Sequence, residues 1–184
     1  MRLFVAVNFD DEVKKKILLV QDELRSKALK GNFSRAENFH ITLAFLGDLE
    51  KSGDKAVDGM SEKLFSIMDE IKAPPFEIRF DKTGCFTHSR KELWWIGADR
   101  SSPGFPVLLS IHAQLLSRLL EAGFSIDTRA FNAHITLARE VKHDERITLD
   151  KPDIGMKVER ISLMNSERIR GVLTYTEIYG KNLG

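Results

Sequence analysis

A chain of 184 residues can bury a core without disulfides, and its single cysteine excludes both an internal disulfide and a cysteine-based zinc site. Its 28 basic and 27 acidic residues nearly balance, which argues against a protein that coats long nucleic acid. The apolar run at the N-terminus is too short for a signal sequence or a membrane span. We therefore expect a cytoplasmic monomer without membrane association, and any nucleic-acid substrate would occupy a local pocket.

The first predicted elements are a strand, a helix and a second strand. Residues 3–7 form an apolar run that is typical of a buried strand. Asp10 can cap the helix that follows, in which apolar residues recur at near-helical spacing until Gly31 ends it. A short strand near Phe33 then leads into a longer strand over residues 39–46.

The middle of the chain predicts a helix, a strand, a turn and another strand. The helix covers about residues 54–71 and the alternating strand covers residues 76–81. Residues 82–91, KTGCFTHSRK, are basic and rich in turn-forming residues, which indicates a loop. Residues 93–98, LWWIGA, follow as a strand.

The remaining elements are a third helix, a strand and a terminal hairpin. The helix covers roughly residues 106–121, and His112 on its apolar face is expected to be a packed, structural histidine. A strand over residues 131–138 follows. Residues 158–164 and 172–179 form the hairpin, with its turn in the segment between them.

One ten-residue phrase occurs twice. RAENFHITLA covers residues 35–44 and RAFNAHITLA covers residues 129–138, with eight of ten positions identical. Each copy ends a strand–helix–strand order, within about residues 3–47 and 93–139 respectively. We infer an internal duplication within a single two-lobed domain, residues 1–184. Its halves would pack about a pseudo-two-fold axis, with the two phrases facing each other across a central cleft.

Each copy places a His-x-Thr triplet on a strand. Because side chains alternate between the faces of a strand, His40 shares a face with Thr42, and His134 shares a face with Thr136. A neutral imidazole can take a proton from water, and an imidazolium can give one to a departing oxygen. Threonine hydroxyls can hydrogen-bond phosphate oxygens, so the set suits metal-free cleavage of a phosphodiester.

Other interpretations remain open on these residues alone. A single His-x-Thr would more readily be a half-buried strand histidine, and duplication could preserve a repeat without function. Duplication does not explain why the polar residues persist while Phe39 and Ala133 have diverged. A non-catalytic module that binds nucleotides or RNA ends is the main alternative. A zinc hydrolase is disfavoured because the repeated residues are histidine and threonine.

The two HITL segments, residues 40–43 and 134–137, resemble the paired HxTx motifs of the two-histidine (2H) phosphoesterase superfamily. Their flanks resemble one branch, the RNA 2′,3′-cyclic phosphodiesterases, also called 2′–5′ RNA ligases. The segments that carry this likeness are RLFVAV, ENFHITLAFLGD, GCF, LWWIG, HITLARE and LMNSERIRGVLTYTEIY. The resemblance implies a bilobal α+β fold, with two antiparallel sheets flanking a central cleft and helices packed outside.

The resemblance also implies an activity without metal or cofactor. RNA ends or small nucleotides with a 2′,3′-cyclic phosphate would be hydrolysed to the 2′-phosphomonoester, with 2′–5′ ligation as a possible reverse reaction. His40 would be the general acid toward the leaving 3′ oxygen, and His134 the general base that activates water. Thr42 and Thr136 would hold phosphate oxygens, and Arg139 matches a basic position of the family that would add positive charge there.

Two residues outside the triplets are weaker candidates. Regular alternation would put Arg139 on the face opposite His134, so a surface arginine at a strand end is an equally good interpretation. Phe86, in the basic segment, could stack on a base. It is a better stacking candidate than Trp94 or Trp95, because alternation buries one of those two.

Overall fold

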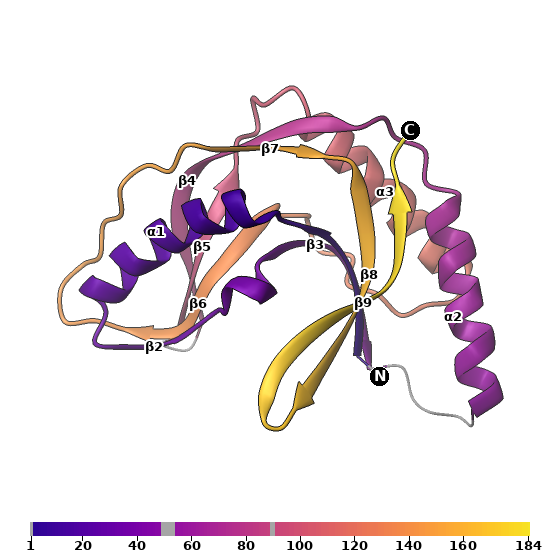
Figure 1. Ribbon diagram of the computed structural model, residues 1–184, viewed down its shortest axis with the longest axis horizontal. Coiled ribbons are helices and arrows are strands. Elements are labelled where there is room, and N and C mark those ends of the chain that lie inside the picture. The colour runs from indigo at the N-terminus through magenta and orange to yellow at the C-terminus, as the bar shows by residue number, and fades with distance from the viewer. Residues whose placement is uncertain (1, 49–53, 89–90) are drawn as a thin grey trace.

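The computed structural model describes residues 2–48, 54–88 and 91–184 (Figure 1). Helices and strands both contribute, and the expected α+β class is confirmed. In chain order the elements are β1 (Arg2–Asn8), α1 (Asp11–Lys27), β2 (Lys30–Phe33), the 3₁₀ helix η1 (Ala36–Asn38), β3 (His40–Asp48), α2 (Asp54–Asp69), β4 (Phe76–His88), β5 (Lys91–Ala98), α3 (Phe105–Glu121), β6 (His134–Lys142), β7 (Ile154–Val158), β8 (Arg160–Ile169) and β9 (Val172–Asn182).

The strands form two antiparallel arms that meet in the middle of one sheet. The strand order is β7-β4-β5-β6-β3-β1-β8-β9, with β2 paired to β6. The arms join between β3 and β6, where Ile41 pairs with Ile135. The two expected sheets are therefore present as two arms of a single hydrogen-bonded sheet. These isoleucines are the middle residues of the two His-Ile-Thr triplets, so the repeated phrases meet at the join.

The helices cover one face of this sheet. Alternate residues of β1, namely Leu3, Val5 and Val7, belong to one core that also contains the apolar stripes of the helices. The backbone N–H of Val13 donates to the Asp10 carboxylate at 2.8 Å, which confirms the expected cap of α1. In the parts of the chain that the structure describes, no helix combines the length and apolar character needed to cross a membrane.

The two halves share an element order but exchange their helices. In β1-α1-β3 and in β5-α3-β6, the first strand pairs with the strand that carries the phrase: Asn8 lies opposite His40, and Gly97 lies opposite His134. The helix of each half, however, packs on the other half. α1 contacts β6, and α3 contacts β3. Each phrase is therefore supported from behind by a helix of the opposite half.

The structure corrects several expected boundaries, and β6 begins at His134 instead of residue 131. α1 ends at Lys27, and Gly31 lies within β2 instead of ending the helix. The terminal hairpin turns at Arg170 and Gly171, where φ is 51° and 84°. Its strands are therefore longer than the sequence predicted, and Figure 1 shows the β8–β9 hairpin extending well beyond the neighbouring strands.

The basic segment 82–91 was wrongly predicted to be a loop. Residues 82–88 continue β4, and β5 begins at Lys91; residues 89 and 90 lie outside the described residues. Residues 82–88 are extended because they pair with β5, with Phe86 opposite Leu93. Phe86 therefore has a fixed place on a strand.

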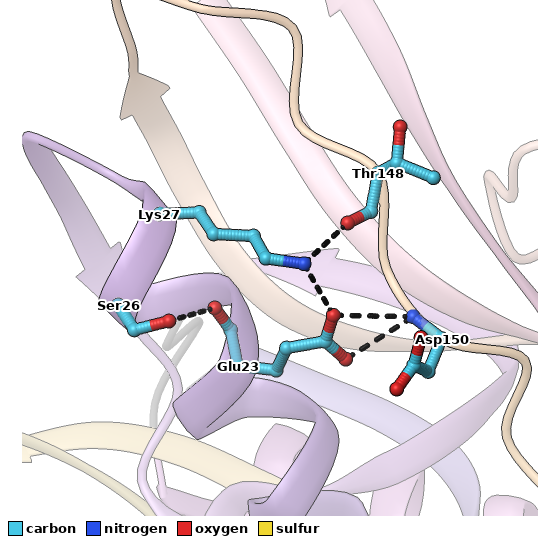
Figure 2. A network of polar contacts seen from close by, with 5 residues as sticks. All are labelled: Glu23, Ser26, Lys27, Thr148 and Asp150. Carbon is cyan, nitrogen blue, oxygen red and sulfur yellow. Dashed lines mark hydrogen bonds and ion pairs between the residues drawn. The ribbon is translucent and has the colours of Figure 1, made fainter.

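The C-terminal end of α1 is attached to the segment between β6 and β7 (Figure 2). Lys27 Nζ donates to the carbonyl of Thr148 at 2.6 Å and pairs with Glu23 at 2.5 Å. The Glu23 carboxylate accepts from the backbone N–H of Asp150, with both oxygens within 3.2 Å. These bonds fix α1 against the arm that carries the second phrase.

Candidate functional site

The two triplets place their polar residues on one face of the sheet. Ile41 and Ile135 have no exposed area and lie in the core, so the histidine and threonine on either side of each point to the other face. We call this the site face. Extending the antiparallel Ile41–Ile135 register by one residue sets His40 beside Thr136, and Thr42 beside His134. Imidazoles and hydroxyls thus alternate around the join of the arms.

His40 is held by backbone and packed between aromatic rings. Its Nδ1 donates to the carbonyl of Asn38 at 2.8 Å, and its Nε2 lies 3.0 Å from Thr42 Oγ1. The ring centroid lies 4.8 Å from that of Phe4 and 5.2 Å from that of Tyr175. Because Nδ1 carries the proton, neutral His40 accepts at Nε2 and the Thr42 hydroxyl donates.

These surroundings favour the neutral form of His40. Burial lowers the pKa of His40 to about 4, although the Asn38 carbonyl raises it. The charges of His134 and Arg139 contribute to this lowering. In the free protein at neutral pH, His40 therefore carries no charge.

Like His40, His134 is hydrogen-bonded to a backbone carbonyl, but its aromatic neighbours are different. Its Nδ1 donates to the carbonyl of Asn132 at 2.7 Å. The Phe86 ring lies edge-on at 5.5 Å, and Trp95 lies at 6.5 Å. Burial lowers the pKa of His134, the Asn132 carbonyl raises it, and the charge of Arg139 lowers it. Arg139 thus acts electrostatically on both imidazoles.

Arg139 reaches the site face because β6 contains a β-bulge. Two consecutive residues of β5 pair with Thr136 and Ala138, so Leu137 is an extra residue. Leu137 and Ala138 are both fully buried, and alternation resumes with Arg139 on the face of His134. The expectation from regular alternation, which put Arg139 on the opposite face, is therefore wrong.

The first phrase contains the matching bulge. In β3 the extra residue opposite β1 is Leu43. The residue that follows the bulge, at the position of Arg139 in the second half, is Phe45. Phe45 is 39% exposed, and its ring lies under the guanidinium of Arg2, at 5.1 Å. Both halves thus contain the bulge, but the residue that follows it is Phe45 in the first half and Arg139 in the second.

Trp95 and Phe86 form an aromatic wall beside His134. The Trp95 indole lies flat on the sheet over two glycines: a Cβ on Gly84 would come within 2.5 Å of the ring, and one on Gly97 within 2.7 Å. The Phe86 ring lies 5.2 Å from Trp95 and is 39% exposed. Trp94 is the buried tryptophan, as alternation predicted for one of the pair. Sequence reasoning missed the two glycines that give the indole its place.

Three further neighbours of the histidines did not follow from the sequence. Asn38 and Asn132 are identical positions of the repeated phrase, and that identity is the signal that could have identified them. Tyr175 comes from β9, at the other end of the chain, so only the fold brings it to His40.

The groups that converge here are suited to an anionic phosphate ester. Two imidazoles can exchange protons, two hydroxyls can donate hydrogen bonds, and one guanidinium can balance negative charge. Among the residues that the structure describes, no cluster of three or more His, Cys, Asp or Glu side chains is placed to hold a metal ion.

Known proteins resemble this chain in sequence and in fold. The model of the 2′-5′ RNA ligase superfamily matches residues 10–170. The RNA 2′,3′-cyclic phosphodiesterase of Archaeoglobus fulgidus is 32% identical over 144 residues, which cover 76% of this chain and 72% of that relative. The Escherichia coli enzyme of the same name is 28% identical over 182 residues, which cover 96% and 93%.

Solved structures of related proteins have a similar fold. Escherichia coli LigT in its apo form superposes with a TM-score of 0.79 at 27% identity, covering 99% of this chain and 96% of LigT. A Thermus thermophilus protein, 23% identical with a TM-score of 0.79, shares the fold. The chain therefore belongs to the 2′-5′ RNA ligase superfamily.

Proposed function

We propose that this protein opens the 2′,3′-cyclic phosphate of RNA ends or small nucleotides to a 2′-phosphomonoester without a metal. The observation that carries the proposal is the meeting of both His-x-Thr triplets at the Ile41–Ile135 pair, on one face of the sheet. The names of the relatives from Archaeoglobus fulgidus and Escherichia coli support the substrate class. Escherichia coli LigT has been solved with 3′-AMP and with phosphate, which supports a nucleotide site.

In the proposed reaction, His134 takes a proton from water as the water oxygen attacks phosphorus. The bond from phosphorus to the 3′ oxygen breaks, and His40 gives its proton to that oxygen. Thr42 and Thr136 donate hydrogen bonds to the non-bridging oxygens, and Arg139 stabilises the charge that develops on them. The bond that forms and the bond that breaks lie on opposite sides of phosphorus, as the two facing imidazoles require.

The lowered pKa of His40 sets a condition on this assignment. With a pKa of about 4 in the free protein, His40 must take up a proton when the substrate binds in order to act as the acid. The negative charge of the bound phosphate favours the imidazolium and raises the pKa of both histidines. The pH dependence of kcat/KM would then report the free protein, and that of kcat would report the complex.

The aromatic wall gives the nucleoside a place beside the phosphate. Phe86 is partly exposed and touches both Trp95 and the ring of His134, so a base that stacks on it would lie next to the reacting phosphorus. Stacking is tolerant of base identity, which suits an enzyme that recognises RNA ends by their cyclic phosphate. With a 5′-hydroxyl in place of water as the nucleophile, the same acid–base pair would form a 2′–5′ bond, and the 3′ oxygen would leave in the same way.

Phosphorus NMR tests the proposal directly. EDTA-treated protein mixed with a nucleoside 2′,3′-cyclic phosphate should give the 2′-phosphate alone, and the His134→Ala variant should give almost none. Binding of the cyclic nucleotide without any product would overturn the proposal and assign the site to a non-catalytic module that binds RNA ends.

A further inference from the structure

Each β-bulge of the site is bonded from behind by a helix side chain. The carbonyl of Leu137, the extra residue of β6, accepts from Gln21 Nε2 at 2.8 Å. The carbonyl of Leu43, the extra residue of β3, accepts from His112 Nδ1 at 2.7 Å. Gln21 lies on α1 and His112 on α3, so each helix holds the bulge of the other half.

Gln21 is unusual for its position on α1. It lies on the apolar stripe with Val13, Ile17 and Leu24, and its side chain is 1% exposed. Its amide N–H groups donate to the carbonyl of Leu137 and to that of Ser34, both at 2.8 Å. A buried amide on such a stripe is tolerated only when it is hydrogen-bonded, so its partners explain its presence.

A bulge needs such a partner because it interrupts the ladder. A buried carbonyl in such a bulge needs hydrogen-bond donors from outside the ladder. The backbone N–H of Ser34 also donates to Leu137 O at 2.8 Å, so Gln21 supplies the second bond and ties the end of β2 to the bulge. The contacts between α1 and the Thr148–Asp150 segment keep the helix, and therefore Gln21, in register with β6 (Figure 2).

The bulge at Leu137 decides where Arg139 points. Without the extra residue, alternation would carry the guanidinium to the helix-covered face. We propose that Gln21 is a positioning residue that stabilises this bulge and thereby holds Arg139 on the site face, and that His112 does the same for the bulge before Phe45. The expected effect on kcat/KM rests on the proposed function, whereas the placement of Arg139 by Gln21 does not depend on it.

His112 is built into its place in a similar way. Its ring stacks on Phe131 with centroids 4.2 Å apart and planes inclined by 14°. Phe131 belongs to the second phrase, whereas the carbonyl that His112 holds belongs to the first. This geometry agrees with the expectation of a packed, structural histidine. The bond to the Leu43 carbonyl also connects His112 to the bulge of β3.

A double-mutant cycle separates positioning from general destabilisation. Gln21→Met keeps the volume and removes the donor, and we expect kcat/KM for a nucleoside 2′,3′-cyclic phosphate to fall about tenfold because Arg139 is misplaced. In an Arg139→Ala background the same change should have almost no further effect.

His112→Leu is the matched control, because its effect should persist in that background. His112→Asn should restore a hydrogen-bond donor at the position of Nδ1. Equal losses from Gln21→Met in both backgrounds would refute the proposal.

Histidine titration by NMR gives a readout that needs no turnover. The positive charge of Arg139 lowers the pKa of His134, with His40 as the other titrating group on the site face. Gln21→Met should therefore raise the pKa of His134, as Arg139→Ala should, while Ile17→Val should destabilise α1 and leave that pKa unchanged. An inactive wild-type protein that shows this pattern would contradict the proposed function alone. An active protein whose His134 titration ignores Gln21→Met would contradict the positioning role alone.

A second variant, Gln21→Asn, tests the proposal if the Gln21→Met protein does not fold. If Gln21→Met does not fold, Gln21→Asn keeps an amide in the core but shortens its reach by one methylene. The same rise in the pKa of His134 is expected, with partial loss of kcat/KM. A folded Gln21→Asn protein with wild-type titration and wild-type kcat/KM would refute the proposal.

Discussion

The two histidines have the same local frame and different surroundings. In both, Nδ1 donates to the carbonyl two residues earlier, Asn38 at 2.8 Å for His40 and Asn132 at 2.7 Å for His134. Both stand before a bulge in their own strand. This frame lies within the repeated phrase, so repetition of the sequence repeats the tautomer and the direction in which each Nε2 points.

The surroundings come from elements outside the phrase. His40 is enclosed by Phe4 and Tyr175, and burial lowers its pKa to about 4. His134 lies beside the partly exposed Phe86, on the strand that carries Arg139. The two histidines thus have the same backbone hydrogen bond but different side-chain neighbours, and this difference can give two identical residues different proton affinities. The phrase therefore sets the geometry of each histidine, and the neighbouring strands set the difference between their proton affinities.

Replacing either histidine should have the largest effect and should show which is the acid. On a 2′,3′-cyclic nucleotide, His40→Ala and His134→Ala should each lower kcat by about 10³-fold, within the usual range for a lost acid or base. On a phosphodiester with a p-nitrophenolate leaving group, which departs without a proton, His40→Ala should recover most of its activity and His134→Ala should not. Recovery by His134→Ala instead would exchange the two roles.

Acidification should destabilise the folded protein through His40. Between pH 6.5 and about 4 the unfolded chain binds a proton at this position and the folded protein does not, so the free energy of unfolding falls as the pH falls. The full effect of a pKa lowered from 6.5 to about 4 is roughly 3 kcal/mol. Urea unfolding at a series of pH values should show this slope in wild type. The His40→Asn variant should lack that part of it, and identical slopes in the two proteins would contradict the lowered pKa.

The residues that follow the two bulges should differ in their importance. Arg139→Ala removes a charge that acts on both imidazoles, and we expect kcat/KM to fall about 10²-fold, as for the loss of one transition-state donor. Phe45→Ala changes the equivalent position of the first half and should cost only a few-fold. Steady-state kinetics on one cyclic nucleotide measures both, and equal losses would mean that the halves contribute symmetrically to the phosphate site.

The sequence predicts the parts of the site that depend on local pattern. The placement of His40 and Thr42 on one face followed from strand alternation, and the repeat predicted the partner pair. Alternation failed at Arg139, because a bulge adds a residue without a sequence signature of its own. The loop predicted around Phe86 was also wrong, because its turn-forming residues outweighed a strand pairing that only the fold provides. Long-range neighbours such as Tyr175 leave no local pattern at all.

Tyr175 offers the finest test of the unequal walls. Its ring meets His40 edge-on at 5.2 Å and Phe4 at 4.9 Å, and it comes from β9, whereas the aromatic neighbours of His134 come from β4 and β5. Tyr175→Ala should admit water to the imidazole and raise the pKa of His40 from about 4 toward 6.5, because burial is the largest cause of its lowering. Phe86→Ala, the matched change on the other wall, should leave the pKa of His40 nearly unchanged. NMR titration of both histidines in each variant measures this. A His40 pKa that stays low without the tyrosine would place the desolvation in β1 and β3, which would make the difference between the two histidines a property of the duplicated strands themselves.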